Sequence, residues 1–131
     1  MDTAAITLSA VDIPYEASAA LCIRAGFIAL RRISDYFDIP YPQNPHYPET
    51  PISVTRAEFD AVLDKLKDSG VSVYADREKA WMDFAGWRVN YDCTLLVLCA
   101  LVMAPRASWS SDRAPKLKLP SLLVFKKKRV D

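Results

Sequence analysis

Three stretches of the chain repeat hydrophobic residues at three- and four-residue steps, the spacing of an amphipathic helix. The first runs from about residue 16 to residue 38, and its apolar stripe consists of Ile23, Phe27, Leu30, Ile33 and Phe37. The polar side of the same stretch carries Arg24, Arg31, Asp35 and Asp38. Because Leu21 and Ile28 widen the stripe, we expect this helix to be covered on more than one side.

A second helix is predicted between Thr55 and Gly70. Thr55 and Glu58 have the spacing of a capping box, in which each side chain bonds to the other's backbone N–H. Val54 and Phe59 stand at the positions of a hydrophobic staple. Gly70 follows the last periodic residue and suits the left-handed conformation that ends many helices. The apolar face continues through Phe59, Val62, Leu63 and Leu66.

A third helical pattern begins after Asp76, a good N-cap, and ends before Pro105. Its apolar positions are Trp81, Phe84, Trp87, Tyr91, Leu95, Leu98 and Val102. Gly86 and the stretch 90–92 weaken its middle, so one kinked helix and two shorter helices are both open. The second half is apolar nearly all round, and we expect it to be the central helix.

Two segments between these helices lack helical periodicity. Residues 39–51 contain five of the nine prolines, a density that excludes helix and favours extended structure. This segment is either a stiff connector whose Tyr41 and Tyr47 pack back on the helices, which we favour, or a ligand strip for an aromatic groove. Residues 71–74 alternate in polarity and predict a short extended piece, for which a ribbon with the C-terminal tail is one possible pairing.

These patterns predict an all-α fold. We expect a small three- to four-helix bundle at residues 1–113, with a proline-rich connector at 39–51 and an irregular basic tail at 114–131. The chain has 131 residues, of which 51% are hydrophobic and 25% charged, as in ordinary globular domains. A single core of that size needs no metal or disulfide to hold it together.

Neither a secretory signal nor a membrane span is predicted. No basic residue precedes the apolar positions of the first thirteen residues. The longest apolar run covers residues 95–104, about half of the roughly twenty residues that a bilayer requires. We therefore expect a cytoplasmic protein, with a membrane-associated location as the alternative.

Candidate catalytic and metal-binding groups are sparse. His46 is the sole histidine and lies in the proline-rich segment, where we expect it to be exposed. Cys22, Cys93 and Cys99 lack the close pairs of zinc sites, and we expect them to be small buried hydrophobes in a reducing compartment. With three glycines, the chain can build no phosphate-binding loop. No catalytic residue, metal site or cofactor is therefore predicted.

The third helical pattern carries one group of polar residues among aromatic ones. Arg88 and Asp92 stand four residues apart and can form an ion pair. The group is either a structural ion-pair network, reaching Arg24 or Arg31 of the first helix, or a ligand-binding pocket with aromatic walls. Its members are Arg77, Asp83, Trp87, Arg88, Asn90, Tyr91 and Asp92.

Charge is unevenly distributed along the chain. Residues 106–131 carry eight Lys/Arg and two Asp, a net +6, whereas residues 1–105 carry nine Lys/Arg and fourteen Asp/Glu, a net −5. An acidic body argues against nucleic acid as a partner. The tail is either a solubilising run or a contact with a protein partner or an anionic membrane surface, through Phe125, Lys126, Lys127, Lys128 and Arg129.

Residues 21–113 carry four stretches that resemble a known class of protein: CIRAGFIALRRISDYF, PISVTRAEFDAVLDKL, DFAGWRVNYD and MAPRASWSSDR. They are similar to the soluble C-terminal region of uncharacterised bacterial multi-helix membrane proteins. DFAGWRVNYD is the most distinctive of the four. No transmembrane helices precede the stretch here, and the tail after Arg113 departs from the pattern, so a free-standing relative and a truncated gene are both open.

The resemblance implies a cytosolic, membrane-proximal regulatory or interaction module and supplies no mechanism. We therefore expect a non-enzymatic helical interaction module that self-associates or binds a protein partner. The alternative is a small-ligand binder or enzyme with a polar pocket around Arg88, Asn90 and Asp92.

Overall fold

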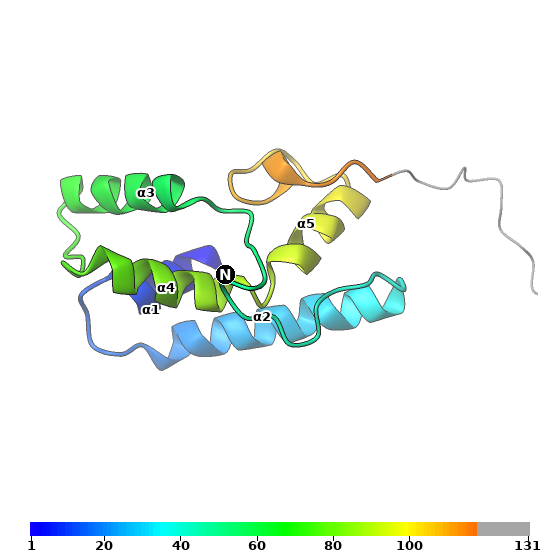
Figure 1. Cartoon of the computed structure of the whole chain (residues 1–131), viewed down its shortest axis with the longest axis horizontal. Coiled ribbons are helices and arrows are strands. Elements are labelled where there is room, and N and C mark those ends of the chain that lie inside the picture. The colour runs from blue at the N-terminus through cyan, green and yellow to red at the C-terminus, as the bar shows by residue number, and fades with distance from the viewer. Residues whose placement is uncertain (118–131) are drawn as a thin grey trace, which may run out of the picture.

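The computed structural model describes residues 1–117, and the described chain is mainly helical. It has five α-helices rather than three or four: α1 (Asp2–Ala10), α2 (Ala17–Tyr36), α3 (Arg56–Asp68), α4 (Arg77–Arg88) and α5 (Asp92–Leu101). A single 3₁₀ turn, η1 (Ser111–Arg113), follows them. In Figure 1, α1 and α4 lie between α2 on one side and α3 on the other.

Helix α1 is absent from the prediction, because its nine residues have little amphipathic periodicity and no side-chain N-cap. Packing against α2 and α4 stabilises this helix instead. Its buried positions are the small residues Ala5, Ser9 and Ala10, which allow close contact with α4 and α2. The Ser9 hydroxyl donates a hydrogen bond of 2.7 Å to the Ala5 carbonyl, so burying it leaves no unmade bond.

Helix α2 forms where the sequence predicts it. Glu16 is its N-cap, and its carboxylate accepts from the Ser18 backbone N–H at 3.0 Å. The expectation that several sides of this helix are covered is wrong. Leu21 is 66% exposed and Ile28 is 38% exposed, so neither widens the buried face. The buried residues are Ala19, Ile23 and Ser34.

Helix α3 confirms each predicted end signal. The Thr55 hydroxyl accepts from the Glu58 N–H at 3.2 Å, and the Glu58 carboxylate accepts from the Thr55 N–H at 2.8 Å. Val54 and Phe59 are both buried in the core. At the other end, Gly70 has φ +84°. The Val71 N–H bonds to the Leu66 carbonyl at 2.9 Å, which completes a Schellman motif.

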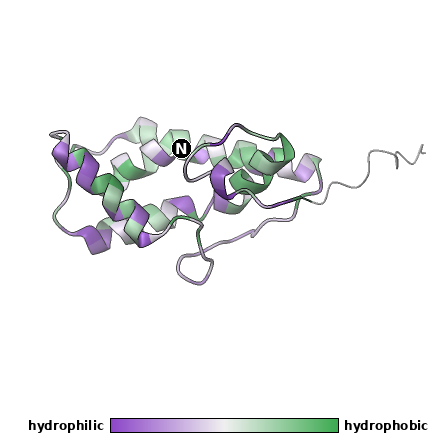
Figure 2. Ribbon diagram, turned by 90° about the horizontal axis from the view of Figure 1, so that it is seen from above, coloured by the Kyte–Doolittle hydropathy of each residue, from purple (hydrophilic) through white to green (hydrophobic). Residues whose placement is uncertain are grey.

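The third helical pattern is two helices, α4 and α5, separated at residues 89–91. The central helix is α4 and not α5, contrary to the prediction. Helix α4 buries Ala80, Trp81, Phe84, Ala85 and Arg88. Helix α5 is almost entirely apolar, but its buried residues are only Asp92, Thr94 and Leu98. Figure 2 shows hydrophobic and hydrophilic residues mixed along the helices.

Aromatic rings from α3 and α4 form the centre of the core. The Phe59 and Phe84 ring centroids lie 4.9 Å apart, and those of Phe59 and Trp81 lie 5.5 Å apart. Trp109, from the loop before η1, adds an edge contact to Phe84 at 5.7 Å. These contacts join segments that are far apart in the sequence into one core.

The loops around the helices contact them at defined points. Tyr47 accepts a hydrogen bond of 3.2 Å from the Trp81 indole N–H, and the Tyr41 hydroxyl donates to Asp35 at 2.9 Å. Both tyrosines of the proline-rich segment therefore contact helices, and the role of the segment as a stiff connector stays a prediction. Residues 71–74 pair with the N-terminal segment, through an antiparallel bridge between Val11 and Val73. Most of the tail in the suggested ribbon lies outside the described residues, so that pairing stays a prediction.

Candidate functional site

The structure divides the seven residues of the predicted polar group among four places. Arg77 contacts α3, where its guanidinium pairs with Asp64 and lies 3.7 Å from an Asp60 oxygen. Asp83 pairs with Lys79 on the exposed side of α4. Arg88, Tyr91 and Asp92 form a buried cluster, and Trp87 and Asn90 line a separate cleft.

The buried cluster is centred on the guanidinium of Arg88, which is fully buried. Its Nε donates to Asp92 at 2.6 Å, and its two terminal nitrogens donate to Asp2 and to the Trp109 carbonyl, each at 2.5 Å. The guanidinium also lies 5.1 Å from the centroid of the Tyr91 ring. One side chain thereby connects α1, α4, α5 and the segment before η1.

The acidic partners of Arg88 also accept hydrogen bonds from other residues. Asp2 accepts from the Tyr91 hydroxyl at 2.7 Å, and Asp92 accepts from the Ser53 N–H at 2.9 Å and from the Ser53 hydroxyl at 2.7 Å. Burial alone would lower the pKa of Arg88, but the two carboxylates raise it above its ordinary value. Burial, together with the Asp2 charge, raises the pKa of Tyr91 far above its ordinary value.

This arrangement has the properties of a structural network. Every nitrogen of the Arg88 guanidinium has a partner within the described chain, and neither Arg88 nor Asp92 lines the cleft. The partner from α1 is Asp2, not Arg24 or Arg31 of α2. Arg31 comes no closer to the group than a 3.5 Å contact with the Asn90 carbonyl.

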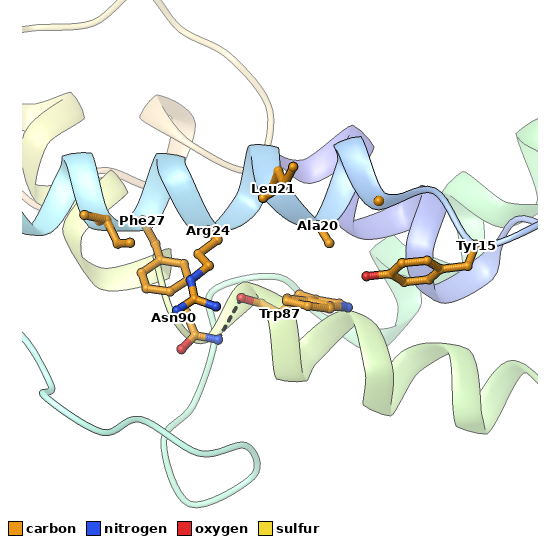
Figure 3. Close-up of a pocket in the computed structure, with 9 residues that line it drawn as sticks. Tyr15, Ala20, Leu21, Arg24, Phe27, Trp87 and Asn90 are labelled. Atoms are coloured by element: carbon orange, nitrogen blue, oxygen red, sulfur yellow. Dashed lines mark hydrogen bonds between the residues drawn. The ribbon is translucent and has the colours of Figure 1, made fainter.

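The cleft lies between α2 and the C-terminal end of α4 and has a volume of about 660 Å³. Figure 3 shows the Trp87 ring beneath Ala20, with Tyr15 at one end of the cleft and Arg24 beside Asn90 at the other. The Asn90 amide nitrogen donates to the Gly86 carbonyl at 2.9 Å, which fixes the orientation of its side chain. The lining residues are Tyr15, Ala17, Ala20, Leu21, Arg24, Phe27, Ile28, Trp87 and Asn90.

A second surface feature of α2 is an exposed stripe of five residues that contains no charged side chain. We call it the α2 stripe, and its members are Cys22, Ala25, Ala29, Ile33 and Tyr36. Successive members are three or four residues apart, so they share one face of the helix. Tyr36 is 82% exposed and Ile33 is 44% exposed. Because each residue of an α-helix is turned by about 100° from the one before it, this face points away from both the core and the cleft.

The cysteines are not buried as predicted. Cys22 and Cys93 are exposed, and Cys99 is half-buried. Burial raises the pKa of the Cys93 and Cys99 thiols above the ordinary value. An apolar helical pattern does not require that other elements cover every side of the helix, so these cysteines can be exposed. His46, in contrast, is exposed in its loop as expected.

Several residues that the sequence analysis missed contribute to these sites. Asp2 and Trp109 complete the Arg88 cluster, but they lie 86 and 21 residues away from it in the sequence. Tyr15, Ala17 and Ala20 line the cleft but carry no motif. The five residues Phe125, Lys126, Lys127, Lys128 and Arg129 lie outside the described residues, so the predicted contact with a membrane or partner stays a prediction.

Within residues 1–117, no three His, Cys, Asp or Glu side chains gather as a metal site would require. None of the helices in that range has the length and hydropathy to cross a membrane. Comparison with protein families, curated proteins and solved structures finds no match to this chain.

Proposed function

We propose that this chain is a non-enzymatic helical interaction module that associates with a second copy of itself through the α2 stripe. The observation that carries the proposal is the exposure of the α2 stripe along most of the longest helix, with Arg32 as the charged residue at its edge. The stripe extends over fifteen residues, or about 21 Å of helix. Its exposed tyrosine and isoleucine are side chains of the kind that anchor protein interfaces.

The order of residues along the stripe favours a second copy as its occupant. In an antiparallel pair of α2 helices, Cys22 faces Tyr36 of the second copy and Ala25 faces its Ile33. Ala29 then faces Ala29 on the twofold axis. Each large side chain meets a small one, and the same surface serves both copies, as a twofold interface requires. The stripe is thus complementary to itself in the reversed direction.

The pairing is expected to be weak. Only one helix from each copy takes part, and this keeps the buried area below the roughly 1,200 Å² that separates standard interfaces from transient ones. The module therefore exchanges between monomer and dimer as its concentration changes. A location near a membrane, which the resemblance and the basic tail imply, stays an expectation.

Cysteine cross-linking tests the antiparallel arrangement. In a background with the three native cysteines replaced by alanine, Ala29→Cys places two thiols at the twofold axis. We expect mild oxidation to convert most of this variant into a disulfide-linked dimer on a non-reducing gel. The matched control is Ala61→Cys, an exposed alanine of α3, which should remain monomeric. Equal cross-linking of the two variants would overturn the proposed arrangement.

Sedimentation equilibrium tests self-association without any cross-link. The unmodified chain should show a monomer–dimer equilibrium, and Ala29→Glu should shift it to monomer, because a charge at the twofold axis meets its own copy. A strictly monomeric unmodified chain would refute self-association. A dimer that persists in Ala29→Glu would show that another surface is used.

The alternative function, a small-ligand site around Arg88, Asn90 and Asp92, has narrower support. Arg88 and Asp92 use their hydrogen-bonding groups within the cluster, so they offer a ligand little. Asn90 and Trp87 line the cleft, and they are the members of the predicted group that a ligand there could touch.

A further inference from the structure

The cleft between α2 and α4 has the size and chemistry of a small-molecule site. Its volume of about 660 Å³ falls within the range of roughly 300–1,000 Å³ found for ligand pockets. Ala17 and Ala20 leave space in the cleft beside α2, because the side chain of alanine is only a methyl group. The Trp87 ring forms the opposite wall, so a flat or extended apolar group would have carbon on both sides.

The cleft carries a positive charge that no described residue neutralises. None of its nine lining residues is acidic, whereas Arg24 supplies a guanidinium. Within residues 1–117 the ion pairs of arginine involve Arg56, Arg77, Arg88 and Arg113, and Arg24 has none. Figure 3 shows the Arg24 side chain directed into the cleft beside Asn90.

We propose that this cleft binds an anionic amphiphile, a carboxylate carried on an unbranched alkyl chain. The carboxylate pairs with the Arg24 guanidinium, whose planar fork matches the two oxygens. The chain extends from Arg24 toward Tyr15, across Ala20 and over the Trp87 ring. Tyr15 lies just before α2, and from Ala17 to Arg24 the helix rises by about 10 Å, which suits a chain of medium length.

The positive charge of Arg24 disfavours cationic and neutral ligands. A cationic amphiphile would be repelled by the Arg24 guanidinium, and a neutral one would gain no ion pair with it. The site lies on a different side of α2 from the α2 stripe. Ligand binding and self-association can therefore be tested separately, and the failure of either leaves the other standing.

Calorimetric titration with decanoate, kept below its micelle-forming concentration, tests the proposal. We expect saturable binding at one decanoate per chain, and binding of decylammonium, which has the same alkyl chain and the opposite charge, at least tenfold weaker. Arg24→Gln should weaken decanoate binding tenfold or more. The matched control is Arg32→Gln, because Arg32 is exposed on the same helix but does not line the cleft.

NMR spectroscopy tests where decanoate binds. The side-chain amide of Asn90 and the indole N–H of Trp87 should shift in a proton–nitrogen NMR spectrum on addition of decanoate, and the indole signals of Trp81 and Trp109 should stay in place. Equal binding of decanoate and decylammonium, or equal effects of Arg24→Gln and Arg32→Gln, would overturn the proposal. Decanoate binding without a shift at Asn90 or Trp87 would also overturn it, by placing the ligand elsewhere.

Discussion

Glu58 joins two parts of the structure through one carboxylate. It completes the capping box at the start of α3 and also accepts from Arg113, at 2.8 Å, just before the end of the described chain. The hydrogen bond from Arg113, followed by that from the Thr55 backbone, lowers the pKa of Glu58 from 4.5 to about 2. Arg113 additionally donates to the Ser53 carbonyl at 2.7 Å, so the loop before α3 is held at the same point.

The lowered pKa of Glu58 predicts a pH-dependent contribution to stability. A carboxylate whose folded pKa is depressed stabilises the fold above its unfolded pKa of 4.5, and this contribution is lost as the pH falls toward about 2. Urea unfolding should therefore show that the free energy of unfolding falls more for the unmodified protein than for Glu58→Gln as the pH is lowered across this range. Glutamine at position 58 can still complete the capping box. A difference between the two that did not change with pH would contradict the assignment.

At the scale of the elements, local backbone chemistry determines where the helices end. Gly70 ends α3 with φ +84°, a conformation that strains residues with a Cβ atom. Gly86 lies within α4 and has ordinary helical geometry. A Cβ atom built at either glycine would have no neighbouring atom within 4 Å. The two positions therefore differ in backbone conformation and not in available space.

Alanine at these two glycines should have opposite effects. Gly70→Ala should destabilise the protein by about 1–2 kcal/mol, because alanine disfavours the left-handed conformation. Gly86→Ala should stabilise it by about 0.5–1 kcal/mol, because glycine is a poor residue in a helix interior. Free energies of unfolding from urea titration monitored by circular dichroism measure both. Effects of the same sign would show that the helix end is not set by the backbone of Gly70.

For the whole molecule, the Arg88 cluster is the contact that joins the most distant parts of the chain. Asp2 and Arg88 are separated by 86 residues in the sequence, and Arg88 also holds the Trp109 carbonyl. The cluster lies at the junction of α1, α4 and α5, where α4 ends and the chain turns. Burial of so many charges is tolerable only because each is paired.

Removal of the Arg88 guanidinium should destabilise the whole fold. Arg88→Met leaves Asp2 and Asp92 without their cation, and we expect a loss of about 3–5 kcal/mol in the free energy of unfolding. Arg88→Lys keeps the charge but cannot reach all three partners, so its loss should be smaller. The exposed control Arg24→Gln should change stability by less than about 0.5 kcal/mol. A near-neutral Arg88→Met would mean that the cluster does not stabilise the fold.

The features predicted correctly are those encoded within about four residues of each other. The start and end of α3 follow from Thr55, Glu58 and Gly70, and the helical spacing of α2 and α4 follows from periodic side chains. Trp87 and Asn90 of the predicted polar group line the cleft, but their role in binding a ligand stays a prediction. Capping bonds and helical periodicity depend on neighbouring residues, so they can be identified before the rest of the chain is placed.

Tertiary packing decided the remainder. Helix α1 has almost no periodicity, and Asp2 becomes a partner of Arg88 only after the chain folds back over more than eighty residues. The exposure of the α2 stripe was equally hidden, because an apolar helical pattern does not show which of its sides another element covers. Contacts between distant segments depend on the arrangement of every helix between them, and single-sequence periodicity carries no information on that arrangement.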